Sequence, residues 1–184
     1  MYKVISIGID QSYTKTGISI AADGKLLKVR STNFKGCICK SDKRIMLGGI
    51  IEQLLTNLIP KAEKLIIITE RIRMHRGGVL SITYMKCTGA LVGTIVDTAR
   101  KQGIKVFSAD TRAWKSKVVG TTKGIDGDNK MPTIKHICKL GFTSSIKSLN
   151  KKGEVKWDDD AADSGCIALY AFVPRKLRHL NLEE

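Results

Sequence analysis

The segment Asp158-Asp159-Asp160-Ala161-Ala162-Asp163 directly precedes the last long apolar run of the chain, Ser164 to Val173. Four aspartates within six residues are unexpected in a protein with a formal net charge of +15. As a helix from about residue 158 to 173, the segment places Asp160 and Asp163 on one face, with Asp159 next to Asp163. Because like charges at this spacing repel, the cluster indicates either a bound divalent cation or a helix N-terminus, which favours carboxylates.

The length and composition fit one globular domain. A chain of 184 residues can bury a core without disulfides, so we expect a single domain over residues 1–184 with a basic tail at 174–184. No apolar run approaches the roughly 20 residues of a membrane helix, and no signal peptide is evident. The five cysteines are scattered without the spacing of a zinc site. We therefore expect a cytoplasmic protein with reduced thiols.

The charge balance points to a polyanionic partner. Lysine and arginine number 32 against 17 aspartate and glutamate, and the excess is uneven, because residues 101–156 hold 13 basic and 4 acidic residues, or +9 of the +15. A mixed, solubilising surface is the simplest alternative. An excess of this size more often accompanies nucleic acid than membrane.

The pattern of apolar residues predicts an α/β fold. Strands are expected at 2–10, 16–22, 26–32, 64–70 and 104–108, and helices at 42–58, 79–102, 110–119, 133–140 and 158–173. The apolar set expected for the helix at 42–58 is Ile45, Ile51, Leu54, Leu55 and Leu58. We expect loop at 120–130 and a polar, basic, mobile segment at 143–156. The order βββ-α-β-α-β predicts a five-stranded mixed sheet with helices on both faces.

Carboxylates close two of the expected strands, at Asp10 and at Glu70. Sheets of this kind carry ligands at the carboxyl ends of their strands. If the last helix crosses these ends, Asp160 and Asp163 join them, and four carboxylates would repel strongly unless cations neutralise them. Oxygen ligands select Mg²⁺ or Mn²⁺. Two such ions about 4 Å apart would bind the attacking water and the leaving oxygen of a phosphodiester.

Each carboxylate also has a simpler explanation. Asp10 could begin a turn, and Glu70 could pair with Arg71 or Arg73 as readily as bind a metal. The two aspartates before Asp160 fit a helix cap better than a ligand set. No single carboxylate distinguishes these explanations, and the metal hypothesis depends on the joint pattern.

Several motifs together resemble the RuvC type of Holliday junction resolvase, over about residues 3 to 173. The matching segments are Gly8-Ile9-Asp10 with Thr16-Gly17, Ile67-Ile68-Thr69-Glu70, Arg112 to Gly120, Lys130 after a glycine-rich loop, and Asp160-Ala161-Ala162-Asp163. The resemblance implies a ribonuclease H-like fold and a homodimer. It also implies Mg²⁺- or Mn²⁺-dependent paired nicking of four-way DNA junctions.

The resemblance also assigns residues. It implies that Asp10, Glu70, Asp160 and Asp163 bind the catalytic metals. Lys115 and Lys130 match basic residues near the scissile phosphate, where they would hold phosphate oxygens and offset charge in the transition state. The expected further DNA contacts are Arg71, Arg73, Arg76, Arg112, Lys117 and Lys123.

The chain departs from the family pattern at two places. Gln11-Ser12 stands where the family usually has Pro-Gly, and Arg73 stands where some members place an aromatic residue that stacks on unpaired bases. Arginine can also stack and bind phosphate. We expect a divergent, phage- or plasmid-like member with a looser substrate preference.

The homodimer would place two equivalent sites on a roughly two-fold symmetric junction. The expected interface is the helix at 79–102, through Tyr84, Leu91, Ile95 and Val96, although these residues could equally belong to the chain's own core.

Three other functions share parts of this sequence pattern. Asp10 to Gly17 resembles the phosphate loop of actin-like ATPases and sugar kinases, but those enzymes need a second domain that this chain has no room for. A ribonuclease acting on RNA–DNA hybrids would share the carboxylates. A non-catalytic junction-binding protein would retain them for structure.

Overall fold

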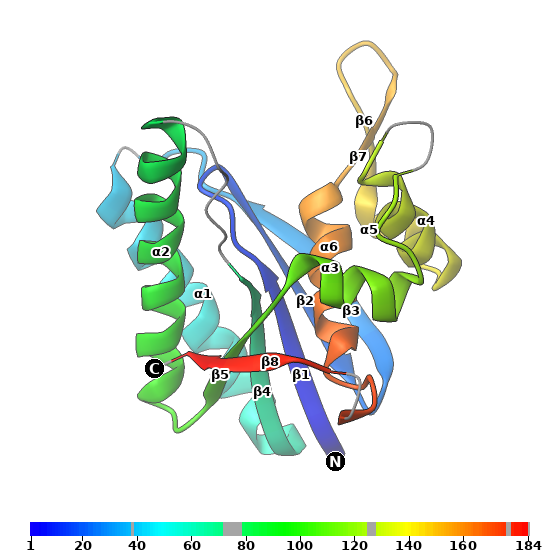
Figure 1. Cartoon of the computed structure of the whole chain (residues 1–184). Helices are drawn as coiled ribbons and strands as arrows, with labels where there is room; N and C mark the ends of the chain where they lie inside the picture. The colour runs from blue at the N-terminus through cyan, green and yellow to red at the C-terminus, as the bar shows by residue number, and fades with distance from the viewer. Residues whose placement is uncertain (38, 72–78, 125–127, 176–177, 184) are drawn as a thin grey trace.

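The computed structural model describes residues 1–37, 39–71, 79–124, 128–175 and 178–183, with side chains from residue 85 onward in the third range (Figure 1). The strands are β1 (Tyr2–Asp10), β2 (Lys15–Ala22), β3 (Lys25–Asn33), β4 (Ala62–Glu70), β5 (Lys105–Ala109), β6 (Lys147–Leu149), β7 (Val155–Trp157) and β8 (Leu180–Glu183). The helices are α1 (Lys40–Leu58), η1 (Ile59–Lys61), α2 (Val79–Arg100), α3 (Thr111–Trp114), η2 (Lys115–Val119), α4 (Met131–Lys139), α5 (Thr143–Ile146) and α6 (Asp159–Tyr170).

The main sheet has the order β3-β2-β1-β4-β5-β8. β1 pairs antiparallel with β2 and parallel with β4, and β4 pairs parallel with β5, so a mixed sheet is confirmed. The predicted number of five strands is wrong, because the basic tail supplies β8, which pairs antiparallel with β5. The backbone N–H of His179 donates to the Tyr170 hydroxyl (2.9 Å), which turns the tail back toward the sheet.

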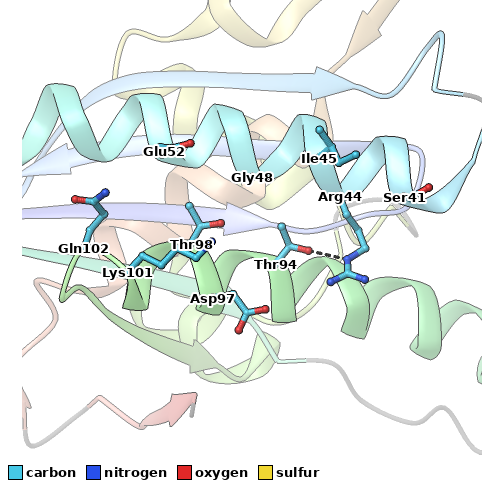
Figure 2. Close-up of a pocket in the computed structure, with 10 residues that line it drawn as sticks. All are labelled: Ser41, Arg44, Ile45, Gly48, Glu52, Thr94, Asp97, Thr98, Lys101 and Gln102. Carbon is cyan, nitrogen blue, oxygen red and sulfur yellow. Dashed lines mark hydrogen bonds between the residues drawn. The ribbon is translucent and has the colours of Figure 1, made fainter.

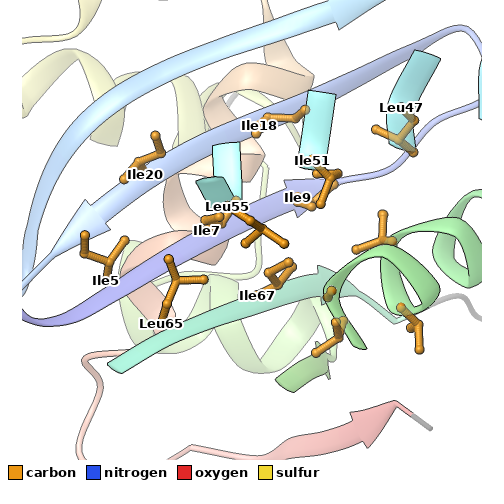
Figure 3. Packing of buried hydrophobic residues seen from close by; sticks show 14 of the residues in the cluster. Ile5, Ile7, Ile9, Ile18, Ile20, Leu47, Ile51, Leu55, Leu65 and Ile67 are labelled. Atoms are coloured by element: carbon orange, nitrogen blue, oxygen red, sulfur yellow. The ribbon is translucent and has the colours of Figure 1, made fainter. Parts of the chain in front are cut away.

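Helices cover both faces of the sheet, as predicted (Figure 1). α1 and α2 pack on one face, where alternate residues of β1, β2 and β4 meet the buried side of α1; this cluster is shown in Figure 3 and includes Ile5, Ile7, Ile9, Ile18, Ile20, Leu47, Ile51, Leu55, Leu65 and Ile67. The opposite face, with Ile66 and Ile68 of β4, packs against α6 and α4. β4 is therefore buried on both sides, which is typical of a strand with a continuous apolar run.

The second face of β1 and β2 is lined by small residues, and α6 lies directly on it. A Cβ atom added at Gly8 would overlap the Ser164 carbonyl oxygen, and one added at Gly17 would overlap the carbonyl oxygen of Asp160. Gly17 is also the cross-strand partner of Asp10. The absence of side chains here lets the helix backbone approach the sheet closely, and this brings the first turn of α6 beside the end of β1.

Three local predictions differ from the structure. Ile45, expected on the apolar side of α1, is 74% exposed, and Leu47 is buried in the core instead. The segment 143–156, expected to be mobile, forms α5 and the antiparallel hairpin β6–β7. The predicted helix at 110–119 is two pieces, α3 and the π-helix η2, which ends at Gly120 with φ +85°.

Among the helices of the described ranges, none combines the length and the apolar character that a membrane span requires.

Candidate active site

Asp10 and Glu70 close two adjacent parallel strands, β1 and β4, and α6 packs against both strands. Burial raises the pKa of Asp10 well above its ordinary value, and the charges of Glu70, Asp163 and Asp160 raise it further, together with a hydrogen bond to Glu70. Four carboxylates therefore act on one another at this end of the sheet. The sequence predicted this set of four, and the structure brings them together.

Asp163 is the most enclosed of the carboxylates on α6. Its Oδ1 is buried and has no hydrogen-bond partner among the described residues, while its Oδ2 lies 4.0 Å from Lys115 Nζ. Burial raises the pKa of Asp163 to about 6, and nearby Glu70 adds to this effect. Lys115, Thr133 and Lys130 act in the opposite direction without cancelling it.

These features fit a divalent cation. A buried carboxylate oxygen without a donor, close to other carboxylates, is stabilised when a hard cation accepts its lone pairs. In the described part of the chain, no group of three or more acidic, histidine or cysteine side chains is already arranged to enclose an ion. Asp160 Oδ2 lies 3.2 Å from Lys15 Nζ. If Asp160 bound a metal ion, the metal would therefore replace Lys15 as its partner.

Asp158 is a helix cap, as predicted. Its Oδ1 accepts from the Ala161 backbone N–H (2.9 Å) and from Lys15 Nζ (2.7 Å), and its Oδ2 accepts from the Ser31 hydroxyl (2.5 Å). Although burial acts to raise the pKa of Asp158, these hydrogen bonds lower it below its ordinary value. Asp158 is thus held ionised, away from the carboxylates that repel one another.

Lys15 was missed by the sequence analysis. Burial lowers its pKa, but the hydrogen bond to Asp158 and the charge of Asp160 outweigh this and raise it. The pairing joins β2 to α6 over a separation of more than 140 residues. No local sequence pattern indicates a contact between residues so far apart in the chain, so the role of Lys15 could not be predicted from the sequence.

Gln11 holds the end of β4 in place. Its Nε2 donates to the Glu70 carbonyl oxygen (2.5 Å), and its Oε1 accepts from the Glu70 N–H (3.2 Å). The β1–β4 ladder ends one residue earlier, at Ile9 and Thr69, so the side-chain amide extends it by one step. Thr111 adds a hydrogen bond from its hydroxyl to Glu70 Oε1 (2.6 Å). Both Gln11 and Thr111 were missed as site residues, and the departure from Pro-Gly after Asp10 was the signal for Gln11.

The two lysines assigned to catalysis occupy different places. Lys115, on the π-helix η2, has a side chain only 15% exposed beside Asp163, and its Nζ also donates to the Asn129 carbonyl oxygen (3.4 Å). The Lys130 side chain is 60% exposed and pairs with Asp159. Both lysines border the carboxylates, with Lys115 deeper in the site.

The structure describes four of the six residues expected to contact DNA. Arg71 follows Glu70 at the carboxyl end of the central strand β4, while Arg112, Lys117 and Lys123 are exposed on α3, η2 and the loop after it. Arg73 and Arg76 lie outside the described residues. A hollow of about 290 Å³ beside Glu70 is lined by Thr69, Glu70, Arg71, Val92 and Glu183.

A larger groove, of about 420 Å³, lies between α1 and α2 on the opposite face from α6 (Figure 2). It is lined mainly by polar residues, and Arg44 Nε donates to the Thr94 hydroxyl within it (3.0 Å). Of the expected dimer anchors on α2, Leu91, Ile95 and Val96 are buried in the chain's own core, so they cannot anchor a partner. The side chain of Tyr84 is outside the described set.

The arrangement of strands and helices is that of the RuvC-type, ribonuclease H-like fold. Thermus thermophilus RuvC in complex with a Holliday junction substrate has a TM-score of 0.66 at 15% identity, covering 98% of this chain and 99% of that chain. A second Thermus thermophilus RuvC structure has a TM-score of 0.67 at 17% identity, over 97% and 99%. The yeast mitochondrial Holliday junction resolvase Ydc2 has a TM-score of 0.50 at 15% identity, over 89% and 75%.

No known protein-family profile and no curated protein matches the sequence. The structural likeness confirms the fold that the sequence motifs predicted. At these identities the likeness is one of fold, so the activity must be argued from the site.

Proposed function

We propose that this protein is a structure-selective DNA endonuclease that resolves four-way junctions by metal-dependent phosphodiester hydrolysis, making paired nicks as a homodimer. The observation that carries the proposal is the partly buried set of Asp10, Glu70, Asp160 and Asp163, in which burial and the charges of the other three carboxylates raise the pKa of Asp10. A fold needs no such cluster for stability. Its natural use is to bind two Mg²⁺ or Mn²⁺ ions.

The chain's own residues would divide the work. Bound Mg²⁺ or Mn²⁺ would lower the pKa of the attacking water and neutralise the phosphate. Asp10 and Glu70, fixed on strand ends and held by Gln11, would orient the ligand set. Lys115 is placed to hold a non-bridging phosphate oxygen and to offset charge that develops in the transition state.

The basic surface next to the site supports DNA as the substrate. Arg112, Lys117 and Lys123 are exposed on the segment that also carries Lys115. Phosphate contacts of this kind supply affinity without reading sequence. One structure of the same fold, Thermus thermophilus RuvC, is a complex with a Holliday junction substrate, and this favours branched DNA over other polyanions.

The test is cleavage of four-way, three-way, flap, duplex and RNA–DNA substrates, with Mg²⁺, with Mn²⁺ and with EDTA. We expect symmetric nicks in the four-way junction that require the metal. Asp10→Asn and Asp163→Asn should abolish nicking and leave junction binding equal or tighter, because a negative charge near phosphate is lost. Asp97→Asn, on the exposed side of α2, is the matched control and should cleave normally.

Two outcomes would replace the proposal. Preferential cleavage of RNA–DNA hybrids would identify a ribonuclease H-type enzyme with the same carboxylates. Junction binding without cleavage in either metal would identify a non-catalytic junction-binding protein. Full nicking by Asp10→Asn would remove the metal site from the mechanism.

A further inference from the structure

The β6–β7 hairpin projects from the end of the molecule that carries the carboxylates (Figure 1). β7 ends at Trp157, immediately before the cap of α6, and the Asp158 N–H donates to the Ile146 carbonyl oxygen (2.7 Å) at the base of the hairpin. The hairpin is therefore anchored to the helix that presents Asp160 and Asp163. All residues from 147 to 156 are exposed, so the rest of the described chain covers neither face.

The tip of the hairpin is a closely hydrogen-bonded turn. Asn150 Oδ1 accepts from the N–H groups of Lys152 (2.8 Å) and Glu154 (2.9 Å), and Asn150 Nδ2 donates to Glu154 Oε2 (2.6 Å). Gly153 completes the turn with φ +79°. An isolated two-stranded hairpin is marginally stable in water, so this network serves to keep a projecting arm in shape.

The arm carries charge and apolar surface that its own fold does not use. Between 147 and 156 there are four lysines and one glutamate, a net charge of 4 − 1 = +3, and the glutamate is tied to Asn150. Leu149 and Val155 are cross-strand partners, 66% and 49% exposed, on the same face as Trp157. Exposed apolar residues flanked by lysines fit a surface with phosphates at its edges and bases between them.

We propose that the β6–β7 hairpin is a DNA-binding arm that lies in a groove of the duplex next to the cleavage site. A two-stranded ribbon fits the major groove, where Leu149 and Val155 would contact base edges and Lys151 and Lys152 would contact phosphates. The charge excess favours DNA over a protein partner. This inference rests on the proposed function for the location of the duplex, and the arm would extend the contact beyond the scissile phosphate.

The experiment measures binding in EDTA, where cleavage is absent, of a four-way junction and of a linear duplex, across a series of salt concentrations. The variant is Lys151→Ala/Lys152→Ala. The matched control is Lys61→Ala/Lys64→Ala, which removes the same charge from exposed positions at the opposite end of β4. A second variant, Leu149→Ser/Val155→Ser, tests the apolar face without changing charge.

We expect the hairpin lysine pair to weaken binding about tenfold and to lower the salt slope by close to two, while the control pair changes neither. The apolar variant should weaken binding several-fold with an unchanged slope. Equal effects of the two lysine pairs, or wild-type binding by both hairpin variants, would overturn the inference. A protein that binds duplex through the hairpin but cleaves no branched DNA would leave the arm intact and refute the proposed function.

Discussion

At the scale of single residues, Gln11 shows how the residue after Asp10 supports the candidate site. Gln11 is 4% exposed, and both polar atoms of its side-chain amide form hydrogen bonds with the Glu70 backbone. We predict that Gln11→Ala lowers the cleavage rate at least tenfold, because Glu70 loses its fixed position, and costs about 1–3 kcal/mol of stability. Single-turnover cleavage and thermal unfolding measure the two effects.

The control for Gln11 is its neighbour Ser12, whose hydroxyl forms a hydrogen bond, within the described part of the chain, only with the Thr14 hydroxyl (3.4 Å). Ser12→Ala should cleave as the wild type does. Because Gln11 acts through Glu70, junction affinity in EDTA should be unchanged in Gln11→Ala. An unaltered rate in Gln11→Ala would show that Thr111 alone positions the carboxylate.

Asp163 makes a prediction about stability and pH. Its pKa of about 6 in the folded protein lies above the ordinary 3.8, so the folded state binds this proton more tightly than the unfolded chain. The metal-free protein therefore loses stability as pH rises from about 4 to 6, and above that carries a penalty of about 3 kcal/mol. Asp163→Asn should raise Tm by several degrees at pH 7 in EDTA, with the difference vanishing near pH 4.

Metal binding should reverse this order. Mg²⁺ or Mn²⁺ that binds only the folded state should raise the Tm of the wild type and leave that of Asp163→Asn nearly unchanged. Wild-type and variant proteins with equal stability in EDTA at pH 7 would contradict the raised pKa of Asp163.

The two lysines to which the proposal gives a catalytic role should not be equivalent. Lys115 lies in the site beside Asp163, and Lys130 is more exposed and pairs with Asp159. We predict that Lys115→Ala lowers the single-turnover rate about 100-fold and Lys130→Ala about tenfold, with smaller effects on binding. Lys135→Ala, which is exposed on α4, serves as the control. A larger effect at Lys130 would mean that the phosphate lies nearer the α6 N-terminus.

At the scale of elements, the packing of α6 on β1 and β2 sets the position of the α6 carboxylates relative to Asp10. Gly17→Ala would force the carbonyl of Asp160 away from the sheet, so we predict a loss of about 1–3 kcal/mol or more and a loss of cleavage. Gly49→Ala, in α1 where a Cβ meets nothing, should be neutral or slightly stabilising. Thermal unfolding of both variants measures the difference.

The elements also show what could be predicted from sequence. β1 and β4 have continuous apolar runs that end in Asp10 and Glu70, so both strands and both carboxylates were accessible to pattern analysis. β8 was not, because its four residues lie in a basic tail and form a strand only through pairing with β5. The hairpin was missed for a similar reason, since its polar sequence lacks a buried face. Lys15 and Gln11 act through contacts that only the tertiary fold creates.

At the scale of the whole molecule, the proposed dimer makes a prediction about products. Mixed dimers of wild-type and Asp10→Asn chains, purified through two different tags, should nick one strand of a junction and leave it unresolved. Dimers with the same two tags and both chains wild type should give two linear duplexes. Denaturing and native gels of the same reaction distinguish the outcomes. Complete resolution by the mixed dimer at the wild-type rate would exclude the model in which each of the two active sites nicks one strand.

The glycines under α6 have a consequence for how this chain tolerates change over time. The relative position of Asp10 and Asp160 is set by backbone meeting backbone at Gly8 and Gly17, with no side chain between them. Most other core positions can exchange one apolar residue for another of similar volume without moving the carboxylates. A library of all single substitutions, selected for junction cleavage, should therefore show these two glycines nearly as intolerant as the carboxylates. Such a sequence can drift far while its site stays fixed.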